Sequence, residues 1–408
     1  MDPKKRKQKL ITSSETADPS ISKMERKKKK KQKLSNSRPL TRPSLSQEEL
    51  REAMKKLNDA ALVLTSKVID AEARNSNFVF SPASISAALT MMAVTNGTHS
   101  DELNAVYSEI ATVVFADDSA SGGPKISAVN GVWIEQSLPV DHSSKDILEN
   151  VFKATFAQVD FRFKAEDVRI EMNKWASDHT NGLIRDILPP GFVTSESVKV
   201  CGNALYFKGA WEKKFDKSLT KHKMFHLLVG KPVRVPFMSS HKDQYIEAYN
   251  GFKVLGLPYR QGRNDDTNRK FSMYFYLPDK KDGLNNLLEE MTSTPGFLDS
   301  HIPKFRVAVG DFRIPKFNFC FMFEASRFFE GDVLLQLYHK ACVEIDEDGA
   351  EAAAVTYVGQ KVSLCRNRKP TPPKRIDFVA EHPFLFMIRE DKTGTVLFAG
   401  QIFDPRAR

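Results

Sequence analysis

Residues 377–405 read DFVAEHPFLFMIREDKTGTVLFAGQIFDP and contain two strongly apolar runs. Between the runs lies Asp391-Lys-Thr-Gly394, a set of residues that favours a turn. Two strand-like runs joined by a short turn predict a β-hairpin at the C-terminal end of the chain.

Strand-like patterns dominate the chain from residue 231 onward, for example in FKVLGLPYR, FSMYFYLPD and FRVAVGDFRIPKFNFCFMF. Two earlier runs, 125–136 and 198–215, are apolar on both faces, which is typical of central strands in a covered sheet. The region before residue 231 is richer in helical patterns. This order predicts an α+β fold with large antiparallel or mixed sheets and helices packed around them.

Helical patterns begin at Ser46, where Ser46-Gln-Glu-Glu49 is a capping box. Apolar residues then recur every three or four positions, so we expect a helix that ends near Asn75. A short strand over 78–80 and a buried helix over 84–94 follow. Residues 167–188 predict another helix, with a break at Asn181-Gly182.

The net charge of +10 comes from the N-terminal tail. Residues 1–43 carry 15 Lys or Arg and four Asp or Glu, so the remaining 365 residues sum to a charge of −1. The tail has almost no large apolar residues and is predicted to be disordered. The nearly neutral body argues against a DNA-reading surface there.

Two basic clusters in this tail, PKKRK at 3–7 and RKKKKKQK at 26–33, predict a nuclear import signal. The alternative is a solvated charge run that binds nucleic acid weakly, non-specifically and in a salt-dependent manner. The import hypothesis places its contacts on Lys4, Lys5, Arg6, Lys7, Arg26, Lys27, Lys28, Lys29, Lys30 and Lys31.

The four cysteines, Cys201, Cys320, Cys342 and Cys365, are too few and too scattered to predict a disulfide framework or a zinc cluster. No apolar run reaches the length of a membrane span, and the N-terminus lacks the apolar core of a secretory signal. We therefore expect the nucleus, with the cytoplasm as the second compartment.

Motifs of known catalytic chemistry are missing, including the nucleophile elbow and the phosphate-binding loop. His222 and His226 fall in a strand-turn-strand pattern, where a spacing of four residues spans about 13 Å, too far to share a metal. His382 lies in an apolar strand and is expected in the core. The sequence predicts neither an enzyme nor a cofactor or metal.

Residues 347–356 read EDGAEAAAVT, a small-residue segment without an apolar face. As an extended strand it would place only small, uncharged side chains on one face, namely Ala350, Ala352, Ala354 and Thr356. The other face would carry Glu351, Ala353, Val355 and Tyr357.

Four stretches in order along the chain resemble the serpin family: FVFSPASISAAL (78–89), NALYFKGAWEKKF (203–215), EIDEDGAEAAAVT (344–356) and the hairpin of 377–405. The DFVAEHPFLF segment is most similar to plant serpins. The resemblance covers residues 44–408 and implies a single serpin domain after the tail of residues 1–43, with an exposed reactive loop over about 347–373.

The resemblance implies a suicide-substrate inhibitor of a serine or papain-like cysteine protease, which we expect to be a monomer. The hinge of its loop, residues 347–356, would insert into the large sheet after cleavage. Gly349 would act as the pivot, and Glu347 and Asp348 would keep the uncleaved hinge solvated. Insertion of a strand into a packed sheet requires small inward side chains, and the hinge sequence meets this requirement.

The family's usual spacing, counted from Glu347, places the bait bond at Ser363-Leu364, and Arg366 is the alternative if the loop is stretched. Cys365 lies beside Arg366 and is either a reactive thiol or, more simply, a spectator. Two departures from the family pattern keep a non-inhibitory binding or regulatory serpin open as the rival hypothesis. One is a shortened helical region after Val94, and the other is a compressed segment over 322–345.

Overall fold

The C-terminal hairpin lies inside a seven-stranded sheet in the computed structural model, which describes residues 46–98, 100–180, 182, 184–262, 269–328, 335–349 and 375–407. Phe384 pairs with Ile402 across the hairpin, and every residue of both strands is buried. All neighbouring strands of this sheet are antiparallel, in the order β1 (Phe78–Phe80), β16 (Val396–Ile402), β15 (Phe384–Glu390), β9 (Phe271–Pro278), β8 (Phe252–Pro258), β7 (Gln244–Ala248) and β10 (Arg306–Val307).

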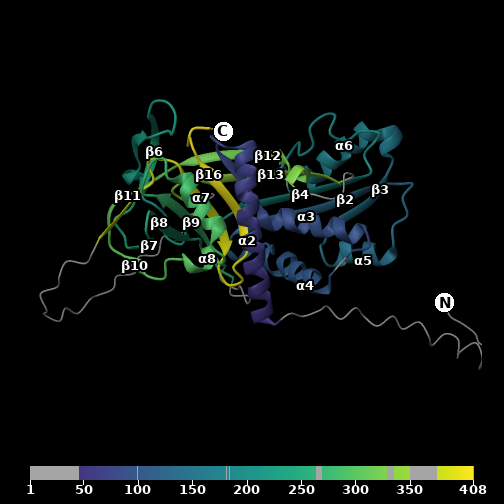
Figure 1. The fold of residues 1–408 in the computed structure, drawn as a ribbon, viewed down its shortest axis with the longest axis horizontal. Helices are drawn as coiled ribbons and strands as arrows, with labels where there is room; N and C mark the ends of the chain where they lie inside the picture. The colour runs from purple at the N-terminus through teal and green to yellow at the C-terminus, as the bar shows by residue number, and fades with distance from the viewer. Residues whose placement is uncertain are drawn as a thin grey trace, which may run out of the picture. The chain divides into compact units, whose positions relative to one another are not determined.

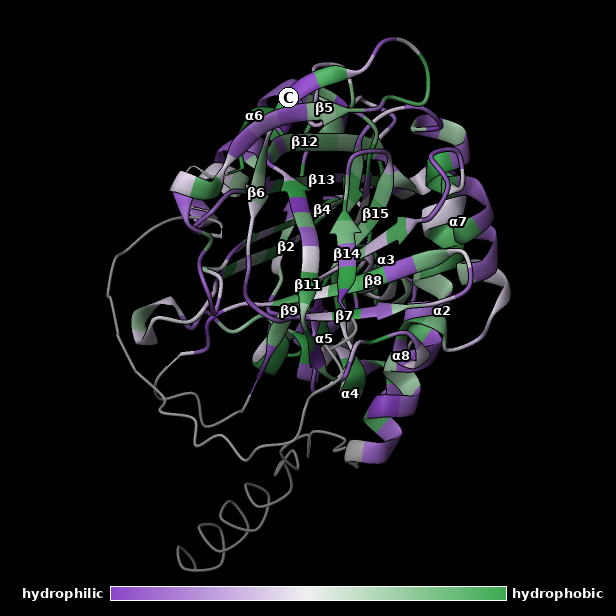
Figure 2. Ribbon diagram, turned by 90° about the vertical axis from the view of Figure 1, so that its left-hand side faces the viewer, coloured by the Kyte–Doolittle hydropathy of each residue, from purple (hydrophilic) through white to green (hydrophobic). Residues whose placement is uncertain are grey.

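A five-stranded mixed sheet carries the two central strands expected from the sequence. Its order is β12 (Phe317–Glu324), β13 (Leu335–Ile345), β4 (Lys199–Lys208), β2 (Lys125–Glu135) and β3 (Thr155–Val159). A four-stranded sheet completes the β structure, in the order β14 (Ile376–Val379), β11 (Val309–Pro315), β6 (Val233–Ser239) and β5 (Lys221–Phe225). Figure 2 shows β15 in the green of hydrophobic residues, whereas the solvent-facing β5 is mostly purple.

Helices pack around these sheets, as Figure 1 shows, with α3, α5 and α6 beside β2, β3 and β4, α4 below α3, and α7 and α8 on the side of β8 and β9. Their bounds are α2 (Gln47–Glu72), α3 (Pro82–Thr95), α4 (Asp101–Glu109), α5 (His142–Asn150), α6 (Phe161–His179), α7 (Leu284–Ser293) and α8 (Phe297–Ser300). One π-helix, η1 (Ile110–Val114), and three 3₁₀ helices, η2 (Ser119–Ser121), η3 (Lys217–Leu219) and η4 (Ala325–Phe328), complete the helical structure of the described residues. The α+β prediction is confirmed. None of the helices in the described ranges is both long and apolar enough to cross a bilayer.

Local sequence signals account for the helix starts better than for the ends. The predicted capping box is present, because the Ser46 hydroxyl accepts from the Glu49 amide and the Glu49 carboxylate accepts from the Ser46 amide. Helix α6 ends at His179, close to the break predicted at Asn181-Gly182, but the prediction that helix resumes and continues to residue 188 is wrong. Gly182 takes a positive φ of 75°, and the Thr180 hydroxyl accepts from the Ile184 amide, which together direct the chain away from the helix.

Two cores flank the five-stranded sheet. On one face, α6 covers β2 and β4 and buries Trp133, Met172 and Val200. On the other face, rings of β12 meet rings of β1, as in the edge-to-face pair of Phe78 and Phe321 at 5.1 Å. The strands next to the hinge are therefore held by packing on both faces of the sheet.

The cysteine prediction is wrong in one respect. Cys320 on β12 lies directly opposite Cys342 on β13, and the two are joined by a disulfide with a Cα–Cα distance of 4.1 Å. The pair was missed because 22 residues separate the two cysteines, and only the register of the two strands brings them together. Cys201 is a buried free thiol, and Cys365 lies outside the described residues.

Candidate functional site

The segment that leads into the predicted hinge is β13, and it has a different neighbour on each side. Its parallel ladder with β4 runs from Leu335↔Lys199 to Ala341↔Leu205. Beyond Ala341, the described residues of β13 pair only with β12. The sheet is thus partly unzipped between β13 and β4, at the end where the hinge begins.

The hinge itself starts as a tight turn over Asp346–Gly349. The Gly349 amide donates to the Asp346 carbonyl at 3.3 Å, and Gly349 forms an antiparallel bridge with Ala210. The loop after β4 fastens this turn from outside. The amide of Trp211 donates to the Asp348 carbonyl at 3.1 Å, and its indole donates to the Asp346 carbonyl at 2.9 Å.

Glu347 is buried, with 4% of its surface exposed, so the prediction that it keeps the hinge solvated is wrong. Its carboxylate accepts from the Lys316 ammonium and from the Thr220 hydroxyl, both at 2.7 Å. Burial alone would raise the pKa of Glu347, but the hydrogen bonds from Lys316 and Thr220 outweigh it and lower the pKa below its usual value.

Asp348 corrects the same prediction, because only 8% of its surface is exposed. Its two carboxylate oxygens accept from Lys214 at 2.9 Å and from Lys217 at 2.6 Å. These hydrogen bonds lower the pKa of Asp348. The start of the hinge is therefore an ion-paired anchor in the uncleaved chain.

Gly349 is required at its position on two grounds. Its φ is 103°, a conformation that L side chains rarely adopt, and an added Cβ would lie 2.3 Å from the carbonyl oxygen of Gly209. Glycine alone therefore lets the chain reverse so close to the end of β4.

A buried histidine lies midway along the β13–β4 boundary. His339 is 1% exposed, its Nε2 accepts from the Ser81 amide at 2.9 Å, and it pairs in register with Asn203 of β4. Burial lowers the pKa of His339 to about 3, so the ring is neutral at physiological pH.

The site includes residues that sequence reasoning missed: Lys214, Lys217, Thr220, Lys316 and His339. No short sequence pattern marks these residues. The two lysines of 214–217, Thr220 and Lys316 lie far along the chain from the Glu347 or Asp348 that they contact, and His339 lies far from its β4 neighbour. The NALYFKGAWEKKF segment, which contains Lys214, was noticed only for its family resemblance.

Other predicted site residues lie outside the described residues, and their roles stay predictions. They are the rest of the hinge (Ala350, Glu351, Ala352, Ala353, Ala354, Val355, Thr356), the bait residues (Ser363, Leu364, Arg366) and both basic clusters of the tail.

His222 and His382 agree with their sequence interpretation. His222 lies exposed on β5, and the chain turns between β5 and β6 as expected. His382 is buried, and its Nε2 hydrogen-bonds the Pro278 carbonyl at 2.8 Å. Burial lowers the pKa of His382 as well. No group of metal-ligating side chains is found within the described residues.

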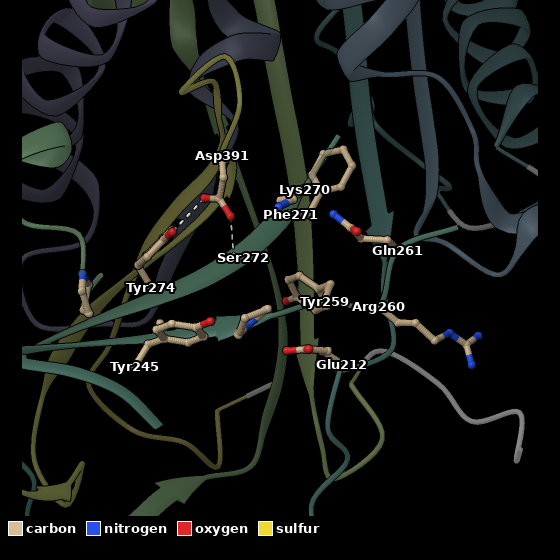
Figure 3. Close-up of a pocket in the computed structure, with 13 residues that line it drawn as sticks. Glu212, Tyr245, Tyr259, Arg260, Gln261, Lys270, Phe271, Ser272, Tyr274 and Asp391 are labelled. Atoms are coloured by element: carbon tan, nitrogen blue, oxygen red, sulfur yellow. Dashed lines mark hydrogen bonds between the residues drawn. The ribbon is translucent and has the colours of Figure 1, made fainter. Parts of the chain in front are cut away.

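A cavity of about 330 Å³ lies close to the ion-paired turn at the start of the hinge. Its wall includes Glu212, Pro258 and Tyr259, and Tyr259 stacks on Trp211, which bonds that turn. Figure 3 shows the side chains of Ser272 and Tyr274 directed at Asp391, and their hydroxyls donate to its carboxylate at 2.6 and 2.7 Å. Burial raises the pKa of Asp391 despite these two bonds. The cavity holds no recognisable catalytic constellation, so the hinge remains the candidate site.

Comparison with known proteins decides the family. Residues 55–405 match the family model for serpins, described as serine protease inhibitors. The chain belongs to the serpin family. Within that family it is 57% identical to Serpin-Z2 of Arabidopsis thaliana over 99% of this chain and 98% of the relative, which supports the plant type.

Two further comparisons extend this similarity over most or all of the chain. The Arabidopsis thaliana protein named "Probable non-inhibitory serpin-Z5" is also 57% identical, over the full length of both chains. Among solved structures, Arabidopsis AtSerpin1 in its native stressed conformation is 43% identical and superposes with a TM-score of 0.78 over 87% of this chain and 98% of that one.

Proposed function

We propose that this chain is an intracellular, nuclear serpin that inhibits a serine or papain-like cysteine protease as a suicide substrate. The protease would cleave the loop that follows Gly349, and the freed hinge would enter the five-stranded sheet as a new strand. The observation that carries this proposal is that pairing between β13 and β4 stops at Ala341↔Leu205, so their boundary is unpaired next to the hinge. The loop is a decoy substrate, and no residue of the chain is assigned a catalytic role.

Strand direction supports entry at this boundary. Because β13 and β4 are parallel, a strand placed between them has the same orientation to both, and a strand that follows β13 through a tight turn runs antiparallel to both. The chain leaves β13 and reverses over Asp346–Gly349, which is the reversal that such a strand needs. The sheet would need to widen by one strand spacing, about 4.8 Å.

The hinge sequence supports the same step. On entry, Ala350, Ala352, Ala354 and Thr356 would point together toward the packed face of the sheet. Small side chains are needed there because the core on either side is already filled by residues such as Leu205 and Val343. The opposite face would carry the larger Tyr357 outward.

Thermal unfolding before and after cleavage within residues 357–368 tests the proposal. An inserted strand adds hydrogen bonds on both edges, each worth about 1 kcal/mol net, so the cleaved chain should melt at a much higher temperature. Incubation with candidate proteases should also give a covalent complex that survives denaturation. An unchanged melting temperature after cleavage would overturn the insertion step.

Two neighbouring substitutions provide the matched control. Ala352→Arg would place a charged side chain on the inward face and should abolish both the rise in melting temperature and the covalent complex. Ala353→Arg makes the same chemical change on the outward face and should leave both intact. Mass spectrometry of the released C-terminal fragment distinguishes cleavage at Ser363-Leu364 from cleavage at Arg366.

A non-inhibitory serpin is the second candidate, favoured by the full-length similarity to a relative named non-inhibitory. The described residues between α3 and β2 also form only α4 and the short helices η1 and η2, in line with the shortened region noted in the sequence. The compressed segment before the hinge, in contrast, still forms a full β12–β13 pair. A protein of this second kind would be cleaved without stabilisation or trapping.

The nuclear part of the proposal rests on the tail alone. A fluorescent fusion of the full chain should accumulate in nuclei, and alanine substitution of the basic residues in both clusters should release it to the cytoplasm. We expect binding of an import receptor, and only weak, salt-sensitive binding of nucleic acid. Loss of polyanion binding on deletion of residues 1–43, with inhibition intact, would separate the two activities.

A further inference from the structure

The solvent-facing side of β12 and β13 carries a matched pair of thiol residues. Inward positions of β12 are filled by phenylalanines, whereas Cys320 lies on the exposed face. Cys342, directly across the ladder, is half-buried. Small molecules in solution can therefore reach Cys320 more easily than Cys342.

The position of this pair in the sheet gives it a mechanical role. Within the described part of the sheet, β12 is the edge strand and pairs only with β13. The disulfide spans the β12–β13 boundary, and the partly unzipped boundary lies on the opposite side of β13. A disulfide at this place fixes β12 to β13 and leaves the boundary between β13 and β4, where a strand would enter, without a covalent link.

We infer that Cys320 and Cys342 form a reversible thiol–disulfide modification site, oxidised by a low-molecular-weight disulfide of the glutathione class. Its effect is to fix the edge strand β12 to β13, so that β13 can separate from β4 but not from β12. This inference does not depend on protease inhibition, because the chemistry involves neither the loop nor a protease.

The reaction has two balanced steps. The Cys320 thiolate attacks one sulfur of the small disulfide, forms a mixed disulfide and releases one small thiolate. The Cys342 thiolate then attacks the Cys320 sulfur, closes the protein disulfide and releases the second small thiolate. The two cysteines lose two electrons and two protons, and the small disulfide is reduced to two thiols. A small thiol in excess reverses both steps.

The remaining cysteines define a clean background for the test. Cys201 is fully buried, and burial raises the pKa of its thiol to about 12, so it should not compete. Cys365 lies outside the described residues and is replaced in all test proteins by Cys365→Ser. The full chain is then equilibrated with oxidised and reduced glutathione, and its intact mass is measured under denaturing conditions.

On the Cys365→Ser background, removing Cys342 and removing Cys320 should have different effects on glutathione uptake. The Cys365→Ser protein should lose two hydrogens on oxidation and retain no glutathione. Adding Cys342→Ser should trap one glutathione on Cys320, because the second step has no nucleophile. Adding Cys320→Ser instead should slow glutathione uptake at Cys342 at least several-fold. Equal uptake by the two variants, or glutathione retained where both cysteines are present, would overturn the inference.

Amide hydrogen exchange provides a second readout that a solvent-exposed bystander pair would not affect. Oxidation should slow exchange in β12 at least tenfold and raise the melting temperature, because the bond closes a loop of the unfolded chain. The double variant Cys320→Ser, Cys342→Ser should behave as the reduced protein in both redox buffers. Identical β12 exchange in oxidised and reduced protein would show that the bond does not fix the edge strand, and would overturn that part of the inference.

Discussion

The two boundaries of β13 are closed to different extents. Toward β12, the antiparallel ladder runs from Glu324↔Tyr338 to Phe317↔Ile345 and is reinforced by a disulfide. Toward β4, the parallel ladder stops at Ala341↔Leu205. The comparison suggests that β13 is fixed on one side and releasable on the other, with the hinge placed at the releasable end.

The largest expected effect comes from weakening the β12 side. The ring of Phe323 is buried at 3% exposure and packs near Phe78, Phe80 and His339. Phe323→Ala should lower the free energy of unfolding by about 3–5 kcal/mol. Urea unfolding measures the loss, and hydrogen exchange should quicken in β12.

The neighbouring Met322 is the matched control, because it points outward and is 40% exposed. Met322→Ala should change the unfolding free energy by no more than about 0.5 kcal/mol. Similar losses for the two variants would contradict the inward and outward assignment of β12.

The next effect concerns the turn at the releasable side. Gly349→Ala combines the strain of a positive φ with a clash against the Gly209 carbonyl, so it should destabilise the protein by about 3 kcal/mol. Gly251→Ala is the control, because its φ of 90° is similar but nothing lies within 4 Å of the added Cβ. That control should lose only about 1 kcal/mol in the same urea titration. Equal losses would mean that the close approach at Gly349 is not maintained.

A smaller effect follows from removing the partner of Glu347. Lys316→Ala leaves a buried carboxylate without its ion pair, and we expect a loss of about 2 kcal/mol, moderated because Lys316 is 33% exposed. Exchange of the amides over 345–349 should quicken. Lys145→Ala, which removes an exposed pair with Glu149, should cost at most about 0.5 kcal/mol. An equally small loss for Lys316→Ala would refute the anchoring role.

Some of these features could be predicted from the sequence, and others could not. The hairpin, the capping box and the central strands β2 and β4 follow from patterns within short windows, and those predictions are confirmed. The burial of Glu347 and Asp348 depends on Lys316 and Lys214, which lie far away along the chain. The Cys320–Cys342 bond depends on strand register. Such contacts are set by tertiary packing, so no local periodicity reveals them.

The smallest and most graded effect is that of pH. The folded pKa of His339, about 3, is below its ordinary value of 6.5, so the unfolded chain binds more protons between these values. His339 therefore contributes stability that is complete above pH 6.5 and is lost as the pH falls toward 3. Glu347 and Asp348 act in the same direction below their ordinary values of 4.5 and 3.8.

Urea unfolding should thus show a loss from His339 of roughly 1 kcal/mol at pH 5.5 relative to pH 7.5. His339→Gln keeps an acceptor for the Ser81 amide but cannot titrate, so it should flatten the pH dependence between 6.5 and 5. An unchanged slope in this variant would show that His339 does not titrate as a buried neutral ring.

The ion pairs that anchor the hinge have a consequence for timing. If the loop inserts, insertion competes with hydrolysis of the bond between the protease and the cleaved loop, and the faster process decides whether the protease is trapped or escapes. Movement of the hinge would stretch or break the ion pair between Asp348 and Lys217. Because the Lys217 side chain is 68% exposed, dissolved salt weakens this ion pair. Ionic strength would then influence the number of loops consumed for each protease trapped, without changing the residues that the protease recognises.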